Sequence, residues 1–122
     1  MDVLYEAEMR QVAILDVLRD RIARGTPPVA DYTRTLVSGV AEHQARIDEL
    51  IRRYALDWTL ERMPPVDRNI LRVAIFELLW QDEIDTPVAI SEAVELAKAL
   101  STDDSPRFIN GLLDRLARFE TA

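Results

Sequence analysis

The sequence has no cysteine, only three glycines and a single histidine among its 122 residues. Without cysteine the chain can form no disulfide, no thiolate metal site and no thiol nucleophile, and such a composition suits a reducing compartment. The lone histidine, His43, has no second histidine or cysteine with which to complete a site, so we interpret it as a solvent-facing side chain. The sequence therefore predicts neither a metal centre nor a cofactor.

Long apolar runs are also missing. No stretch approaches the roughly 20 apolar residues that a membrane-spanning helix needs, and the N-terminus lacks the basic-then-apolar layout of a signal peptide. We therefore expect a cytoplasmic protein with no membrane partner. The length fits one domain over residues 1–122, long enough to bury a single core.

Positive charge is in short supply, since 15 Lys and Arg residues face 22 Asp and Glu residues for a net charge of -7. The excess of acid is uneven: residues 1–65 carry 11 acids and 9 bases, whereas residues 66–122 carry 11 acids and 6 bases. This balance disfavours a purely electrostatic grip on nucleic acid. If RNA binds, the first half of the chain is the expected electrostatic anchor.

Apolar residues recur at helical intervals along the chain, and no segment alternates at period two. This pattern predicts an all-α protein, a compact bundle of five to seven helices. The expected elements are a helix over residues 3–22, a long helix from a cap at Asp31 to Tyr54, about one helical turn near residues 56–63, and helices over 66–81, 87–100 and 106–118.

The helix expected over residues 66–81 has apolar residues around most of its circumference, which indicates a central helix packed on several sides. The next two helices are expected to begin at Thr86-Pro87 and Ser105-Pro106, where a hydroxyl residue caps the helix and proline takes its first position. The predicted buried stripe of the first of these two helices consists of Ile90, Ala93, Val94, Ala97 and Leu100.

The last helix carries the pair Asn110-Gly111 in its interior, where glycine costs about 1 kcal/mol relative to alanine. We interpret Gly111 as a point of close approach between helices and Asn110 as a residue on the polar side. Phe108 lies on the border of the apolar stripe of this helix. Both a wedge between helices and a platform on which a base stacks fit that position.

No group of residues indicates catalysis. Acidic residues gather at 82–85 and at 103–104, but both groups directly precede an expected helix start, where acids interact favourably with the helix dipole. The sequence has no Gly-rich phosphate loop. We therefore expect a protein that is not an enzyme.

Two segments carry a family resemblance, PVDRNILRVAIFELLW and TPVAISEAVELAKALSTDDSPRFINGLLDRLAR. They resemble the C-terminal half of the NusB family of bacterial transcription antitermination factors, whose pattern runs approximately VDR-ILR-A-YEL, P-VAINEAVELAK and EDS-(K/R)FVNG-LD-(I/L)A. The resemblance is close over residues 66–118 and looser over VLYEAEMR. It implies an all-helical fold without catalysis, a heterodimer with NusE, a protein of the small ribosomal subunit, and recognition of boxA RNA from ribosomal RNA operons. It also implies assembly into an antitermination complex on RNA polymerase.

The resemblance implies site residues as well. In the family, RNA contacts come from an Arg-rich N-terminal arm, the first helix and the start of the last helix. The corresponding RNA-binding candidates here are Tyr5, Asp104, Arg107, Phe108 and Asn110. The partner surface of the family maps to Trp58, Glu61, Asp67 and Arg68.

One departure from the family pattern concerns the Arg-rich arm, because this chain begins at MDVLY instead. Phosphate contacts supply most of the non-specific affinity for RNA, so we expect the chain alone to bind RNA weakly. An alternative stays open, namely a NusB-like helical docking module without significant RNA binding of its own. Homodimer formation also stays open.

Overall fold

The computed structural model describes Leu4 and residues 31–56, 58–81 and 83–120. These residues form α3 (Asp31–Tyr54), the short 3-10 helix η1 (Leu60–Arg62), α4 (Pro65–Trp80), α5 (Thr86–Leu100) and α6 (Ser105–Glu120). No strand occurs in this part of the chain, so the all-α prediction is confirmed there. Four α-helices are fewer than the five to seven expected, and the helix expected over residues 3–22 lies outside the described residues.

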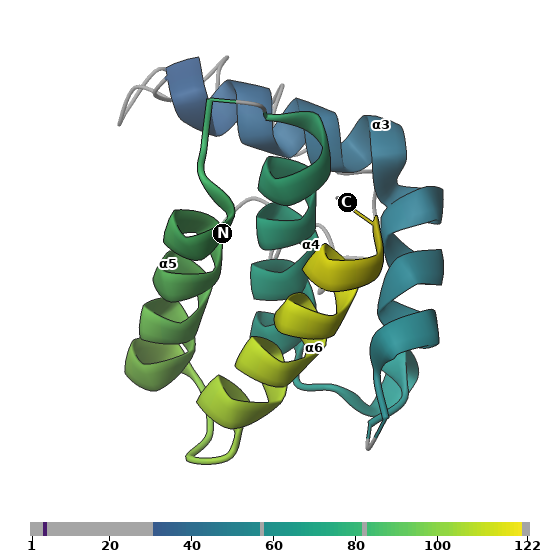
Figure 1. The fold of residues 1–122 in the computed structure, drawn as a ribbon, viewed down its shortest axis with the longest axis vertical. Helices are drawn as coiled ribbons and strands as arrows, with labels where there is room; N and C mark the ends of the chain where they lie inside the picture. Colours follow the sequence, from purple (N-terminus) through teal and green to yellow (C-terminus); the bar gives the residue numbers. More distant parts are fainter. Residues whose placement is uncertain (1–3, 5–30, 57, 82, 121–122) are drawn as a thin grey trace.

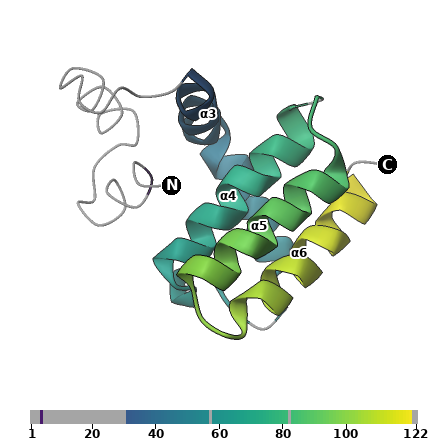
Figure 2. The ribbon, with the colours of Figure 1, turned by 90° about the vertical axis from the view of Figure 1, so that its left-hand side faces the viewer.

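Helix α4 lies at the centre and packs against α3, α5 and α6 (Figure 1). Helices α4, α5 and α6 lie side by side, as Figure 2 shows. Helix α3 crosses over one end of this layer and then runs down its side (Figure 1). None of the described helices combines the length and apolar character that crossing a membrane requires.

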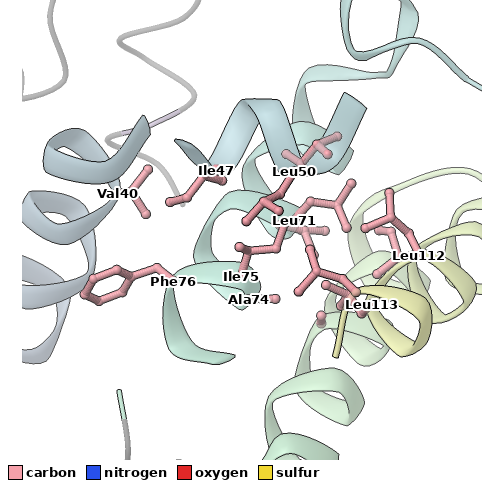
Figure 3. Packing of buried hydrophobic residues seen from close by; sticks show 14 of the residues in the cluster. Val40, Ile47, Leu50, Leu71, Ala74, Ile75, Phe76, Leu112 and Leu113 are labelled. Atoms are coloured by element: carbon pink, nitrogen blue, oxygen red, sulfur yellow. The ribbon is translucent and has the colours of Figure 1, made fainter. Parts of the chain in front are cut away.

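The core gathers around α4 (Figure 3). Adjacent positions of this helix are buried together, which places apolar side chains on more than one of its sides, as at Ile70 and Leu71. Each such side chain contributes about 1.5–3 kcal/mol when it is fully removed from water. The prediction of a central helix is therefore confirmed. The partners of α4 in Figure 3 include Val40, Ile47, Leu50, Leu112 and Leu113.

The crossing of α3 over α4 depends on Gly39. A Cβ atom at this glycine would lie 2.1 Å from Cζ of Phe76, closer than atoms can approach. The ring of Phe76 is buried against the α3 backbone at this point. Gly111, in contrast, has only Nη1 of Arg115 near the position of a Cβ, at 3.3 Å, so the close approach expected at Gly111 occurs at Gly39 instead.

A second contact holds the first turn of α4 to the loop between α5 and α6. The carboxylate of Asp67 is fully buried and accepts hydrogen bonds from the hydroxyls of Ser101 and Ser105, the latter at 2.7 Å. Thr102 extends this network through its own hydroxyl, 2.7 Å from that of Ser105. Ser105 is the first residue of α6 rather than its cap, so that prediction is wrong, and the hydroxyl of Ser105 binds Asp67 instead.

A third polar contact joins α3 to α4 beside the core. Arg72 donates from Nε to Oδ1 of Asp48 at 2.9 Å and from Nη2 to Oδ2 at 3.1 Å. It also donates to the side chain of the buried Asn69 at 3.2 Å. This two-point geometry fixes the relative position of the helices more strictly than a single bond would.

Three local predictions are wrong in detail. Asp85 rather than Thr86 occupies the cap position of α5, and Thr86 is the first helical residue. Leu100 is 55% exposed because α5 ends there, whereas Ala89, one turn before Ala93, is buried. His43 is partly buried rather than solvent-facing, since its ring stacks on that of Trp80 with centroids 4.1 Å apart.

We predict that Gly39→Ala destabilises the protein by about 1–3 kcal/mol, because the added methyl group forces α3 away from Phe76. This loss occurs although alanine is the better helix former by about 1 kcal/mol. Urea unfolding followed by circular dichroism measures the change. Gly111→Ala is the matched control and is expected to be neutral or stabilising, since only the flexible end of Arg115 must move. Equal effects of the two substitutions would contradict this account.

We also predict that Asp67→Ala lowers the free energy of unfolding by about 3 kcal/mol, because it leaves the buried hydroxyl of Ser105 and the partly buried hydroxyl of Ser101 without their charged acceptor. The same unfolding experiment measures the loss. Asp103→Ala, an exposed change in the same loop, should stay within about 0.5 kcal/mol of the unaltered protein. A small effect at Asp67 would show that the loop is held by other contacts.

Candidate nucleic-acid interface

The first turns of α6 present the candidate RNA-binding side chains. Asp104, Arg107 and Asn110 are exposed, and Phe108 is partly buried. The α5–α6 loop that precedes them is held against α4 by the bonds of Ser101 and Ser105 to Asp67. The start of α6 therefore has a fixed position relative to the core.

Phe108 contacts Trp58, which stands in the segment between α3 and η1. The ring centroids are 4.9 Å apart and the ring planes are inclined by 59°. Tilted aromatic pairs of this kind add about 0.5–1.5 kcal/mol beyond the area that they bury. Of the two roles open for Phe108, the structure supplies the packing contact, and base stacking on the remaining exposed part of the ring stays a prediction.

The segment around η1 brings together three of the four partner-binding candidates. Arg68 donates from Nη1 to the carbonyl oxygens of Met63 at 2.8 Å and Leu60 at 3.1 Å, so this side chain anchors η1 to α4. Glu61 is exposed on η1, and Trp58 lies just before it. Arg68 is thus a positioning residue, whereas Glu61 is exposed and Trp58 is partly buried against the core.

Glu61 forms an ion pair with Arg52 of α3 at 3.0 Å. The backbone N–H of Glu61 and then the Arg52 guanidinium lower the pKa of the Glu61 carboxyl, so it is ionised at neutral pH. A shallow pocket of about 260 Å³ adjoins this pair, and its rim includes Leu56, which is 70% exposed. Sequence reasoning missed Arg52 and Leu56. The pocket is lined by Arg52, Ala55, Leu56, Trp58, Thr59, Leu60 and Glu61.

Asp67, the fourth partner-binding candidate, does not lie on this surface. Its carboxylate is fully buried because the α5–α6 loop covers the first turn of α4. The structure therefore corrects the expectation of a direct contact at Asp67. Any effect of this residue on binding acts through the loop that it holds.

Asn110 lies on a different side of α6 from Phe108. It lines a groove of about 450 Å³ between α5 and α6, opposite Pro87 and Ser91. The structure thus brings Phe108 together with Trp58 but directs Asn110 toward α5. Tyr5 lies outside the described residues.

The side chain next to Gly111 is that of Arg115, a contact that sequence reasoning also missed. Arg115 donates from Nη2 to the backbone carbonyl of Tyr54 at 2.8 Å and so joins α6 to the end of α3. Its guanidinium passes 3.3 Å from where a Cβ of Gly111 would lie. Gly111 and Arg115 are four residues apart, about one helical turn, and this spacing could have predicted their contact.

Among the described residues, no group of three or more His, Cys, Asp or Glu side chains has the geometry to hold a metal ion. This end of the molecule offers a partly exposed aromatic pair, an exposed arginine on α6 and an ion pair beside a shallow pocket.

Comparison with known proteins gives a consistent result. The model of the NusB family matches residues 1–118. The transcription antitermination protein NusB of Thermobifida fusca (strain YX) is 56% identical over 116 residues, which cover 95% of this chain and 82% of that protein. The protein of the same name from Kineococcus radiotolerans is 52% identical over 120 residues, which cover 98% of this chain and 88% of that protein.

Solved structures agree with the sequence relatives. The structure of T. maritima NusB superimposes with a TM-score of 0.87 at 34% identity, covering 99% of this chain and 87% of that one. A structure of the antitermination factors NusB and NusE in complex with dsRNA has a TM-score of 0.79 at 23% identity and covers 95% of this chain and 88% of that one, a likeness of fold. The family match over nearly the whole chain and the relatives above half identity lead to one conclusion: the chain belongs to the NusB family.

Proposed function

We propose that this protein is a transcription antitermination factor that binds boxA RNA of ribosomal RNA operons together with NusE. Its family membership and its relatives named transcription antitermination protein support this proposal. A cytoplasmic location, a role in the antitermination complex on RNA polymerase and the absence of catalysis belong to the same proposal.

The observation that carries the proposal is the contact between Trp58 and Phe108. In this contact, Trp58 of the candidate partner surface around η1 lies against Phe108 of the candidate RNA surface at the start of α6, which supports the proposal. A protein bound at Glu61 and an RNA bound at Arg107 would therefore adjoin each other on one end of the bundle. Such an arrangement suits a complex in which the partner contributes contacts to the same RNA.

Because the chain is acidic, the partner is important for contacts to RNA phosphates. With a net charge of -7, the protein repels a phosphate backbone at long range. The first two turns of α6 contain only one basic residue, Arg107. Each phosphate neutralised on single-stranded RNA adds about 0.7 to the slope of log affinity against log salt. A basic partner surface would add phosphate contacts that this chain lacks.

We predict that NusE raises the affinity of the protein for boxA RNA at least about tenfold, a coupling of typical size, and that a scrambled RNA gains less. Fluorescence anisotropy with labelled RNA, with and without NusE, measures both affinities. Equal binding of boxA and scrambled RNA in both conditions would refute the proposal and favour the docking module without RNA function.

The partner surface has a matched pair of variants for the same experiment. Glu61→Lys reverses the charge on η1 and removes the carboxylate that pairs with Arg52. This substitution should therefore weaken the complex with NusE. Glu95→Lys makes the same change at an exposed site on α5, away from η1, and should leave the complex intact. Equal losses from both substitutions would point to net charge rather than to the η1 surface.

We further predict that Phe108→Leu lowers boxA affinity by about 1–3 kcal/mol while the fold persists. Leucine retains apolar packing against Trp58, but it removes the ring on which a base would stack. RNA titration gives the affinity and urea unfolding gives the stability. Phe119→Leu is the control, since Phe119 is an exposed aromatic at the opposite end of α6. Unchanged affinity combined with lost stability would assign Phe108 to packing alone.

A further inference from the structure

A second surface feature lies at the other end of α4, where α3 crosses over α4 and α5 (Figure 1). Two adjoining hollows of about 180 Å³ and 640 Å³ share Tyr32, Glu77 and Glu92 in their walls. Together they form a groove with α4 as its floor and with α3 and α5 as its sides. We call this the α3–α5 groove.

Apolar side chains line much of the α3–α5 groove. Leu36 and Val73 lie in the smaller hollow and are partly buried, and Leu96 beside them is 38% exposed. Val88 borders the larger hollow and is 48% exposed. Exposed apolar side chains that adjoin in a groove, rather than scattered singly, mark surfaces that bind partners.

The charge of the α3–α5 groove has one sign. Among the described residues, its lining includes four carboxylates and no lysine, arginine or histidine. The carboxylates belong to Glu77, Glu83, Asp85 and Glu92. A groove of this kind attracts cations and repels phosphate groups.

Glu77 is the most constrained of these acids. Its side chain is 5% exposed and accepts a hydrogen bond from the hydroxyl of Tyr32 at 2.6 Å. Burial raises the pKa of the Glu77 carboxyl and the charge of Glu92 adds to this effect, while the bond from Tyr32 opposes it. A buried carboxylate among like charges is stabilised when a cation comes within reach.

We propose that the α3–α5 groove is a docking surface for a partner protein that inserts a segment carrying lysine or arginine flanked by apolar residues. The basic side chain would pair with Glu77 and Glu92 in the wider part of the groove. The apolar neighbours of that side chain would pack on Leu36 and Leu96 in the narrower part. Nucleic acid is a poor occupant, because its phosphates would meet four carboxylates.

This surface is separate from the candidate interface around η1 and α6. Glu77 follows Asp67 by ten residues on α4, which corresponds to about 15 Å along the helix axis. The start of α6 lies beside the first turns of α4 (Figure 1), whereas Glu77 of the α3–α5 groove stands in the last turn of α4. RNA and a partner bound at the start of α4 would leave Glu77 uncovered, so the inference goes beyond the proposed function.

The test uses a short synthetic peptide of lysine and leucine as the probe and the full chain as the receptor. In heteronuclear NMR titrations we expect saturable shifts confined to residues of the groove, such as Val88, Glu92 and Leu96. A peptide with glutamate in place of lysine should not bind. Because no RNA or NusE is present, the result does not depend on the proposed function.

Variants separate groove binding from general attraction to an acidic protein. Glu92→Gln combined with Glu77→Gln should weaken the lysine peptide about tenfold, since both pairing charges are lost. Glutamine at 77 still accepts the bond from Tyr32, and the NMR spectrum of the free variant reports whether the fold is kept. If that variant does not fold, Glu92→Lys, an exposed change, provides the same test.

Glu95→Gln is the matched control, because it removes one exposed charge from α5 outside the groove, and it should bind the peptide as the unaltered protein does. Shifts spread over the whole surface, an equal affinity for the glutamate peptide, or equal losses at positions 92 and 95 would overturn the proposal.

Discussion

The buried carboxylate of Asp67 is the contact on which the candidate interface depends. It joins the first turn of α4 to the hydroxyls of Ser101 and Ser105, and so it determines where the α5–α6 loop ends and α6 begins. The direction of α6 in turn places Phe108 against Trp58. A charged acceptor is well suited to this task, because the buried hydroxyl of Ser105 and the partly buried hydroxyl of Ser101 would have no equivalent partner without it. One buried side chain thus positions the residues of the candidate interface.

The opposite end of α4 is built on a steric constraint rather than a polar one. Gly39 lets α3 approach the ring of Phe76, and the two bonds from Arg72 to Asp48 hold the helices beside the core. This close crossing leaves Tyr32 near enough to donate to Glu77. It also determines the width of the α3–α5 groove. The same central helix therefore carries two different surfaces, and separate contacts support each of them.

The helix bounds were largely predictable from the sequence, because periodicity and proline pairs report them directly. The end at Tyr54, the short turn before Pro64-Pro65 and the central helix all agree with the structure. What periodicity could not supply is the partner of each side chain. Asp67 looked like a surface acid at a helix start, and only the position of Ser105, 38 residues later, explains its burial. Gly111 drew attention through its cost in a helix, and Gly39 carries the same cost inside α3, but that cost does not say which helix approaches. Only the approach of Phe76 from another helix reveals its role.

The aromatic contact at the interface limits how this acidic chain can recognise RNA. Trp58 covers part of the Phe108 ring, so a base has only the rest of that ring on which to stack. Arg107 is the single basic residue in the first two turns of α6, so few phosphates can be neutralised there. Neither contribution alone supplies the affinity of a typical specific complex, which requires many phosphate contacts or several base contacts. A basic partner at the adjoining η1 surface would add both charge and area next to the same ring. On this reasoning the pair of Trp58 and Phe108 is a junction between two binding surfaces, and RNA recognition is a property of the complex more than of this chain.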